Sequence, residues 1–194
     1  NEPRITAKRT KFKTRKFKLM NALELINIGT MELKKKNIDS SRLDSELLLS
    51  KTLNKKREDI LINLEQDISC ENFSKYKELI QRRSKNEPIA YIMKQKEFWS
   101  KNFFVSSDTL IPRPETELMV ERLIKIFKEK KISILDIGTG SGCILISLLS
   151  ELTKSKGVGI DISKKALEVA KKNLEKHNML NKIKFFNKSL DDKL

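Results

Sequence analysis

The chain has 194 residues with a formal net charge of +15, and 38% of its residues are hydrophobic while 35% are charged. This balance suits one medium domain or two small ones with a modest core, and no apolar run approaches the ~20 residues that a membrane span needs. Two cysteines and one histidine argue against a disulfide framework, a metal site and a histidine-dependent triad, and they favour the reducing cytoplasm.

Residues 1–19 are rich in lysine and arginine, and Glu2 is the only acid among the first 18. They lack apolar periodicity, so we expect a basic disordered tail over 1–19. The remaining lysines are spread among asparagine and isoleucine rather than interleaved with aromatic residues on one face. Direct nucleic-acid binding is therefore not expected.

Residues 20–87 show the apolar spacing of several short amphipathic helices. We expect folded structure to begin near Met20. The bundle should end at Pro88, because the residue before a proline avoids the helical region. The apolar positions that carry this pattern include Leu23, Ile26, Leu33, Leu47, Leu48, Ile60, Leu61, Tyr76, Leu79 and Ile80.

Residues 88–113 are interpreted as a hairpin linker. Its strands are expected over 91–98 and 103–105, with polar residues 100–102 between them.

A helix is predicted over 114–130. Pro112 and Pro114 fix φ on either side of Arg113, and Pro114 suits the first helical position. Glu115 then places negative charge in the first turn, where the helix dipole favours it.

Residues 132–137 form a short apolar, β-branched run that is typical of a strand buried on both faces. Gly138, Gly140 and Gly142 follow at every second position. Glycine permits positive φ and lets a ligand approach the backbone, and a helix expected over 142–153 places its positive end beneath the loop. The pattern predicts a nucleotide site.

The next strand, expected over 157–161, ends in Asp161, whose carboxylate can accept both hydroxyl hydrogens of a ribose. A dinucleotide fingerprint would need glycine where Cys143 stands, so NAD is disfavoured. The order is instead acid-x-G-x-G-x-G, beginning at Asp136. Cys143 is expected to pack as a small residue rather than to act as a thiolate.

A helix over 163–177 and a strand over 183–187 complete a parallel βαβαβ unit, whose right-handed crossovers give the strand order 3-2-1. His177, at the lysine-rich end of that helix, is expected to be solvated. Three strands are half of a doubly wound sheet, and the chain begins with Asn1. We therefore interpret it as a fragment.

The acid-bounded glycine loop resembles the first motif of class I S-adenosylmethionine (SAM) methyltransferases. Residues 111–117, Ile-Pro-Arg-Pro-Glu-Thr-Glu, together with residues 87–92 and 96–99, resemble the HemK/PrmC family of protein-(glutamine N5) methyltransferases. The resemblance runs from about Met20 to Leu194. It implies an α/β fold in which an N-terminal α-helical bundle precedes a class I Rossmann-like sheet, here truncated after the third strand.

The resemblance also implies a function: methyl transfer from SAM to the glutamine side-chain amide of the Gly-Gly-Gln motif in peptide-chain release factors, in the cytoplasm. In that family the helical domain, here 20–87, grips the release factor, and 114–194 would be the first half of the SAM domain. The family's catalytic Asn-Pro-Pro-Tyr does not occur in the chain. We therefore expect no catalytic residue before Leu194, and an inactive fragment.

Two sets of site residues follow from the resemblance. Cofactor-binding residues would be Asp136, Gly138, Thr139, Gly140, Ser141, Gly142, Asp161 and Leu190. An active-site wall would comprise Arg113, Pro114, Glu115 and Thr116. Ser189 and Leu190 stand where the family often has an acid and then an aromatic residue, while Asp191 and Asp192 are interpreted as a solvated turn.

Two other functions remain open at this point. A nucleic-acid amino-methyltransferase would use the same cofactor fold and would suit the +15 charge. A non-catalytic binding module is the literal state of a fragment. The helical bundle favours a protein acceptor over DNA.

Overall fold

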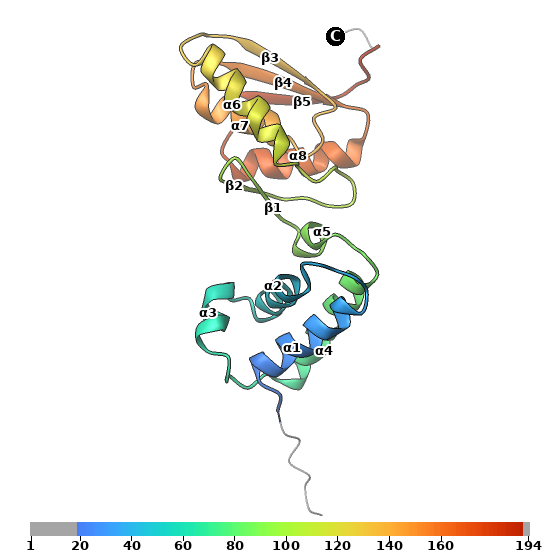
Figure 1. Cartoon of the computed structure of the whole chain (residues 1–194). Coiled ribbons are helices and arrows are strands. Elements are labelled where there is room, and N and C mark those ends of the chain that lie inside the picture. The colour runs from blue at the N-terminus through green and yellow to red at the C-terminus, as the bar shows by residue number, and fades with distance from the viewer. Residues whose placement is uncertain (1–18, 192–194) are drawn as a thin grey trace, which may run out of the picture. The chain divides into compact units, whose positions relative to one another are not determined.

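The structure is a computed structural model that describes residues 19–191 (Figure 1). Its contacts divide the chain into two compact units, Asn1–Ile80 and Gln81–Leu194. The basic tail expected over 1–19 lies outside the described residues except for Leu19, and so does Asp192. Within the described part of the chain, every helix is too short or too polar to cross a membrane.

The helical spacing of the first part of the chain is confirmed. The helices are α1 (Ala22–Lys34), α2 (Ser41–Leu53), α3 (Arg57–Ile62) and α4 (Cys70–Ser84). Asn21 begins α1 with a capping box, in which its side chain accepts the Glu24 N–H at 2.9 Å and the Glu24 carboxylate accepts the Asn21 N–H at 3.0 Å. The first helix therefore begins next to Met20, where the sequence predicted the start of folded structure.

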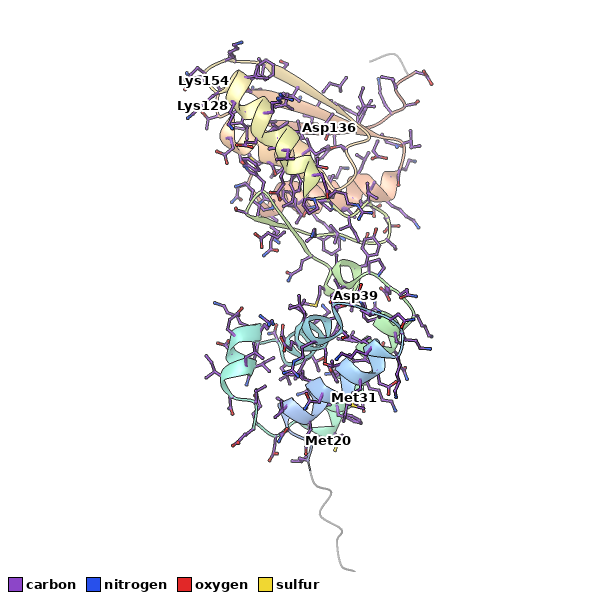
Figure 2. The ribbon with its side chains drawn as sticks, in the orientation of Figure 1. Met20, Met31, Asp39, Lys128, Asp136 and Lys154 are labelled. Atoms are coloured by element: carbon purple, nitrogen blue, oxygen red, sulfur yellow. The ribbon has the colours of Figure 1, made fainter. Side chains whose placement is uncertain are left out.

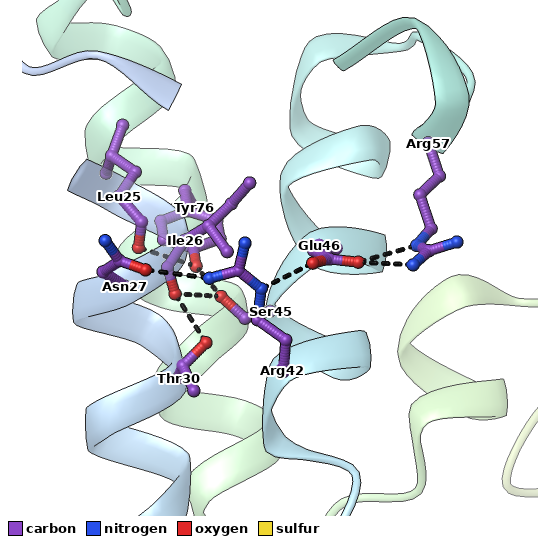
Figure 3. A network of polar contacts seen from close by, with 9 residues as sticks. All are labelled: Leu25, Ile26, Asn27, Thr30, Arg42, Ser45, Glu46, Arg57 and Tyr76. Atoms are coloured by element: carbon purple, nitrogen blue, oxygen red, sulfur yellow. Dashed lines mark hydrogen bonds and ion pairs between the residues drawn. The ribbon is translucent and has the colours of Figure 1, made fainter. Parts of the chain in front are cut away.

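A pair of hydroxyl groups lies in the core of the first unit (Figure 3). The Tyr76 and Ser45 oxygens are 2.6 Å apart, and they reach the backbone carbonyls of Leu25 and Ile26 at 3.1 and 2.8 Å. Burial raises the pKa of Tyr76 to about 12, so its hydroxyl stays protonated. Buried polar groups stabilise a fold only when they are bonded in this way.

A second polar contact joins α1, α2 and α3 through Glu46, whose side chain is only 6% exposed. Arg42 Nε donates to one carboxylate oxygen at 2.6 Å, and Arg57 Nη2 lies 2.7 Å from the other. Arg42 also donates to the Asn27 side chain at 2.8 Å (Figure 3). A buried carboxylate is costly unless it is paired and hydrogen-bonded, so this paired arrangement is what keeps Glu46 in the core.

Gly29 on α1 permits the close approach of the hydroxyl pair. A Cβ there would lie 2.7 Å from Ser45 Oγ and 2.8 Å from Ile80 Cδ1, and it would overlap the Tyr76 hydroxyl. We predict that Gly29→Ala lowers the free energy of unfolding by about 1–3 kcal/mol, the usual cost of overpacking a core.

Urea unfolding of Gly29→Ala, Tyr76→Phe and the double variant tests this prediction. Because the phenylalanine removes the overlapping oxygen, the alanine should cost less in the Tyr76→Phe background than in the wild type. Strictly additive losses would show that Gly29 and Tyr76 are not in steric conflict.

The second unit alternates helices and strands. Its elements are α5 (Ile89–Met93), β1 (Lys96–Phe98), β2 (Lys101–Phe103), α6 (Glu115–Phe127), β3 (Ser133–Ile137), α7 (Cys143–Glu151), β4 (Lys156–Asp161), α8 (Lys164–Lys176) and β5 (Ile183–Asn187). The strands and helices predicted from residue 114 onward are all present, with bounds that differ by a few residues at most.

The hairpin is present, but its predicted bounds are wrong. Residues 91–93, predicted as part of the first strand, lie in the short helix α5, which has Pro88 as its N-cap and Lys94 as a left-handed C-cap. Strands β1 and β2 pair antiparallel with Phe98 opposite Lys101, so the turn is only Trp99 and Ser100. Both turn residues have positive φ, of 53° and 52°, as a two-residue type I′ hairpin requires.

Side chains from two helices anchor this turn. Glu117 on α6 accepts the Trp99 backbone N–H at 2.9 Å, and Glu151 on α7 accepts the indole N–H at 3.3 Å.

His177 is not simply solvated as expected, because its Nε2 lies 3.1 Å from Asn102 O and its ring packs on Phe103. Burial is the main reason that the pKa of His177 is lowered.

The sheet has the predicted parallel order, β3-β4-β5, with Leu135 opposite Val158 and Ile160 opposite Phe186. One face packs against the helices. The core on that side comprises Phe98, Phe103, Val120, Cys143, Leu145, Ile146, Leu148, Leu149, Leu174, Met179 and Ile183. It takes in both phenylalanines of the hairpin.

Strand β3 is not buried on both faces, contrary to its sequence pattern. Leu135 is 43% exposed and Ile137 is 51% exposed, on the face away from the helices. Within residues 19–191, β3 pairs only with β4, and an apolar hollow of about 540 Å³ lined partly by Leu135, Val158 and Phe186 opens on this face. The apolar pattern is real, but no described element covers it.

Candidate functional site

The glycine loop connects β3 to α7 at the carboxyl edge of the sheet. Gly138, Gly140 and Gly142 have φ of +72°, +55° and +76°, which a residue with a Cβ rarely adopts. The N–H groups of Gly138 and Thr139 both donate to Ile160 O, at 2.9 and 3.0 Å. An added Cβ at Gly138 would meet no atom within 4 Å, so the outer side of the loop is open to a ligand.

Asp136 holds the base of this loop from the end of β3 (Figure 2). Its Oδ2 accepts the Thr139 hydroxyl at 2.7 Å. Burial raises the pKa of the Asp136 carboxyl, the Thr139 bond opposes that rise, and the nearby Asp161 charge adds to it. The Asp136 and Asp161 carboxylates thus bond to two residues of the same loop, Thr139 and Gly140.

Asp161 holds the loop from the neighbouring strand. Its Oδ2 accepts the Gly140 N–H at 2.9 Å and its Oδ1 accepts the Ser163 N–H at 2.8 Å. A carboxylate offers about four lone-pair positions, so Asp161 keeps capacity for further donors such as the hydroxyls of a sugar.

Asn187 supports this strand end and was not found by sequence reasoning. Its Nδ2 donates to the carbonyls of Asp161 and Ile162, both at 2.9 Å. Ile162 itself is 78% exposed beside the carboxylate. The sequence signal that could have pointed to Ile162 is its place directly after Asp161, because an apolar side chain after a strand-ending acid can pack on a ligand ring.

Cys143 packs at the start of α7 as predicted. It is buried, and burial raises the pKa of its thiol to about 11, so a thiolate is disfavoured there. Ser141, at 3% exposed, is also buried.

The other predicted residues are less closely tied to the loop. Leu190 is 61% exposed, and the Ser189 hydroxyl accepts the Asp191 N–H at 3.4 Å in a turn. Arg113, Pro114 and Glu115 are exposed and Thr116 is half-buried, and their backbone bonds serve the start of α6. The assignment of these residues to the site stays a prediction.

The helix-covered parallel sheet with an acid-bounded glycine loop is the architecture of a methyltransferase. A methyltransferase-domain family model matches residues 128–192, and a model described as the PrmC N-terminal domain matches residues 24–93. The chain therefore belongs to the HemK/PrmC family of methyltransferases.

Relatives agree with this assignment. A release factor glutamine methyltransferase from Leptospira interrogans is 48% identical over 153 residues, which cover 78% of this chain and 54% of that protein. One from Buchnera aphidicola subsp. Schizaphis graminum is 45% identical over 148 residues, covering 76% and 54%. A bifunctional methyltransferase from Rickettsia typhi is 34% identical over 190 residues, covering 88% and 37%. The chain spans about half the length of the release factor glutamine methyltransferases that it matches.

The raised pKa of Asp136 predicts a pH-dependent stability. The folded protein holds this proton more tightly than the unfolded chain, so stability falls as pH rises from the ordinary value of 3.8 through the folded pKa. Asp136→Asn should therefore be more stable than the wild type at neutral pH and equally stable below that window.

Urea unfolding at a series of pH values measures the difference. Thr139→Val removes the hydroxyl bond that lowers the Asp136 pKa, so the same comparison made in that background should show a larger gain for Asp136→Asn. A constant difference at all pH values would mean that the Asp136 charge does not oppose folding.

Proposed function

We propose that the protein carrying this chain transfers a methyl group from SAM to the glutamine side-chain amide of the Gly-Gly-Gln motif in peptide-chain release factors. One observation carries the proposal: a PrmC N-terminal helical unit and a methyltransferase glycine loop occur in one chain. The names of its relatives support the same acceptor. Release factors act in translation, so the reaction would take place in the cytoplasm.

The residues of the loop suit SAM as the cofactor. SAM supplies a methyl group on an activated sulfonium. In this proposal Gly138–Gly142 lie along the methionine part, and Asp161 accepts the ribose hydroxyls. Ile162, and Leu190 further along, offer exposed apolar side chains for the adenine ring. The open surface at Gly138 and the positive φ of the loop are the features that a cofactor lying against the backbone requires.

The acceptor side relies on other parts of the protein. The helical unit would bind the release factor, and Arg113–Thr116 would line the approach of the glutamine. An amide nitrogen is a weak nucleophile, so positioning it in line with the methyl group matters more than proton transfer. The chain contains no Asn-Pro-Pro-Tyr. We therefore expect methyl transfer from the complete protein and none from the 194 residues alone.

Mass spectrometry of a release factor incubated with SAM tests this function. The complete protein should add one methyl group to the glutamine of Gly-Gly-Gln, and a release factor with that glutamine changed to glutamate should stay unmodified. The +15 charge makes nucleic acid the competing acceptor. Methylation of RNA or DNA in place of the release factor, or of no acceptor at all, would overturn the proposal.

The cofactor role of Asp161 gives a separate prediction. Asp161→Ala should weaken SAM binding by about 1.5–3 kcal/mol, the range for hydrogen bonds to a charged group. Isothermal titration calorimetry measures the dissociation constant. Asp191→Ala, which removes an exposed carboxylate from the same unit, is the matched control and should bind as the wild type does. Equal affinities for the two variants would remove Asp161 from the site.

A further inference from the structure

Asn173 is a fully buried amide in a helix that otherwise packs apolar side chains. It lies on α8 and is 0% exposed. Its buried neighbours on the same helix are apolar, with Ala170 0% exposed and Leu174 5% exposed. A carboxamide loses its bonds to water on burial, so such a position is stable only when its donors and acceptor find partners.

Its partners come from two separate segments. Nδ2 donates to Ser141 O and to Phe104 O, both at 2.9 Å, and Oδ1 accepts the Phe104 N–H at 2.6 Å. A backbone N–H can only donate, so the oxygen must face Phe104 and the orientation of the amide is fixed. One side chain thereby joins α8, the glycine loop and the residue that follows the hairpin.

The bond to Ser141 reaches the part of the loop that the proposed cofactor would touch. Gly140, next to Ser141, donates its N–H to Asp161, and Gly142 on the other side donates to Thr139 O at 2.8 Å. Ribose hydroxyls at Asp161 would share the carboxylate with the Gly140 N–H. The Asn173 bond does not involve that carboxylate, so it holds the loop whatever binds to Asp161.

We propose that Asn173 is a positioning residue for the cofactor loop, one that keeps Ser141 and its glycine neighbours in the conformation that binds SAM. The proposal rests on the proposed function, because it takes SAM as the ligand of this loop. The same amide sets the backbone of Phe104, from which the chain continues to the Pro112–Thr116 segment. The cofactor loop and the residue that follows the hairpin thus share one fixed point.

Three variants separate positioning from simple core packing. Asn173→Ser is smaller and cannot reach both segments. Asn173→Asp keeps an acceptor for the Phe104 N–H but loses both donors. Leu174→Ala is the matched control, because it removes buried atoms from the next residue of the same helix but removes none of the Asn173 hydrogen bonds to the loop and the hairpin end.

Two measurements are made on each protein, well below its melting temperature. Calorimetric titration should show that both Asn173 variants bind SAM about tenfold more weakly or worse than the wild type, because the binding groups of the loop are displaced. Leu174→Ala should bind SAM within about twofold of the wild type, even where its melting temperature falls further than that of the Asn173 variants. Amide hydrogen exchange by NMR, without ligand, should show protection lost at residues 138–142 in the Asn173 variants only.

The outcomes distinguish this inference from the proposed function. If the wild type does not bind SAM, the proposed function fails and loop exchange alone decides the role of Asn173. If the wild type binds SAM and the Asn173 variants match Leu174→Ala in both measurements, Asn173 is a packing residue and the inference is overturned. Failure of both Asn173 variants to fold would also overturn it, because the residue would then be required for the fold and not for the loop.

Discussion

Positive φ at Gly138, Gly140 and Gly142 interrupts the regular backbone, so the polar groups of residues 138–142 rely on partners from other elements. Asp136 on strand β3 accepts a hydrogen bond from Thr139, and Asp161 on strand β4 accepts one from Gly140. Asn173 on helix α8 donates a hydrogen bond to Ser141. The sheet and helices must be correctly assembled for all three bonds to form together. The site is therefore a consequence of the whole second unit rather than of the loop sequence alone.

The ionised Asp136 carboxylate at this loop also opposes the fold. Burial, as the main cause, and the nearby Asp161 charge raise the pKa of Asp136, which means that its ionised form is unfavourable in the folded protein. Donors from Thr139, Gly140 and Ser163 offset part of this repulsion. Under the proposed function a ligand with hydroxyl groups and a cationic sulfonium would relieve the rest. Residues that favour a ligand over stability are common at functional sites.

The two units achieve stability by different means. The first unit buries a bonded hydroxyl pair and a carboxylate between two arginines, so its helices are fixed by polar geometry as well as by apolar packing. The second unit packs an apolar core on the helix-covered face of the sheet, while Leu135, Ile137 and Phe186 remain exposed on the other. Substitutions are therefore least tolerated at Gly29 and Glu46 in one unit, and on one face of the sheet in the other.

The sequence by itself determined the helices of the first unit, the parallel order of the strands, and the glycine loop with an acid at each strand end. These features follow from local periodicity, from glycine spacing and from the handedness of crossover connections, none of which needs distant contacts. Only the tertiary structure decided the bounds of the hairpin, the exposure of β3 and the roles of Asn173 and Asn187. Each depends on which backbone atoms or faces come to lie beside a segment distant in sequence, as Asn173 does beside Phe104 and Ser141. An asparagine on a helix gives no local signal of partners that folding alone brings to it.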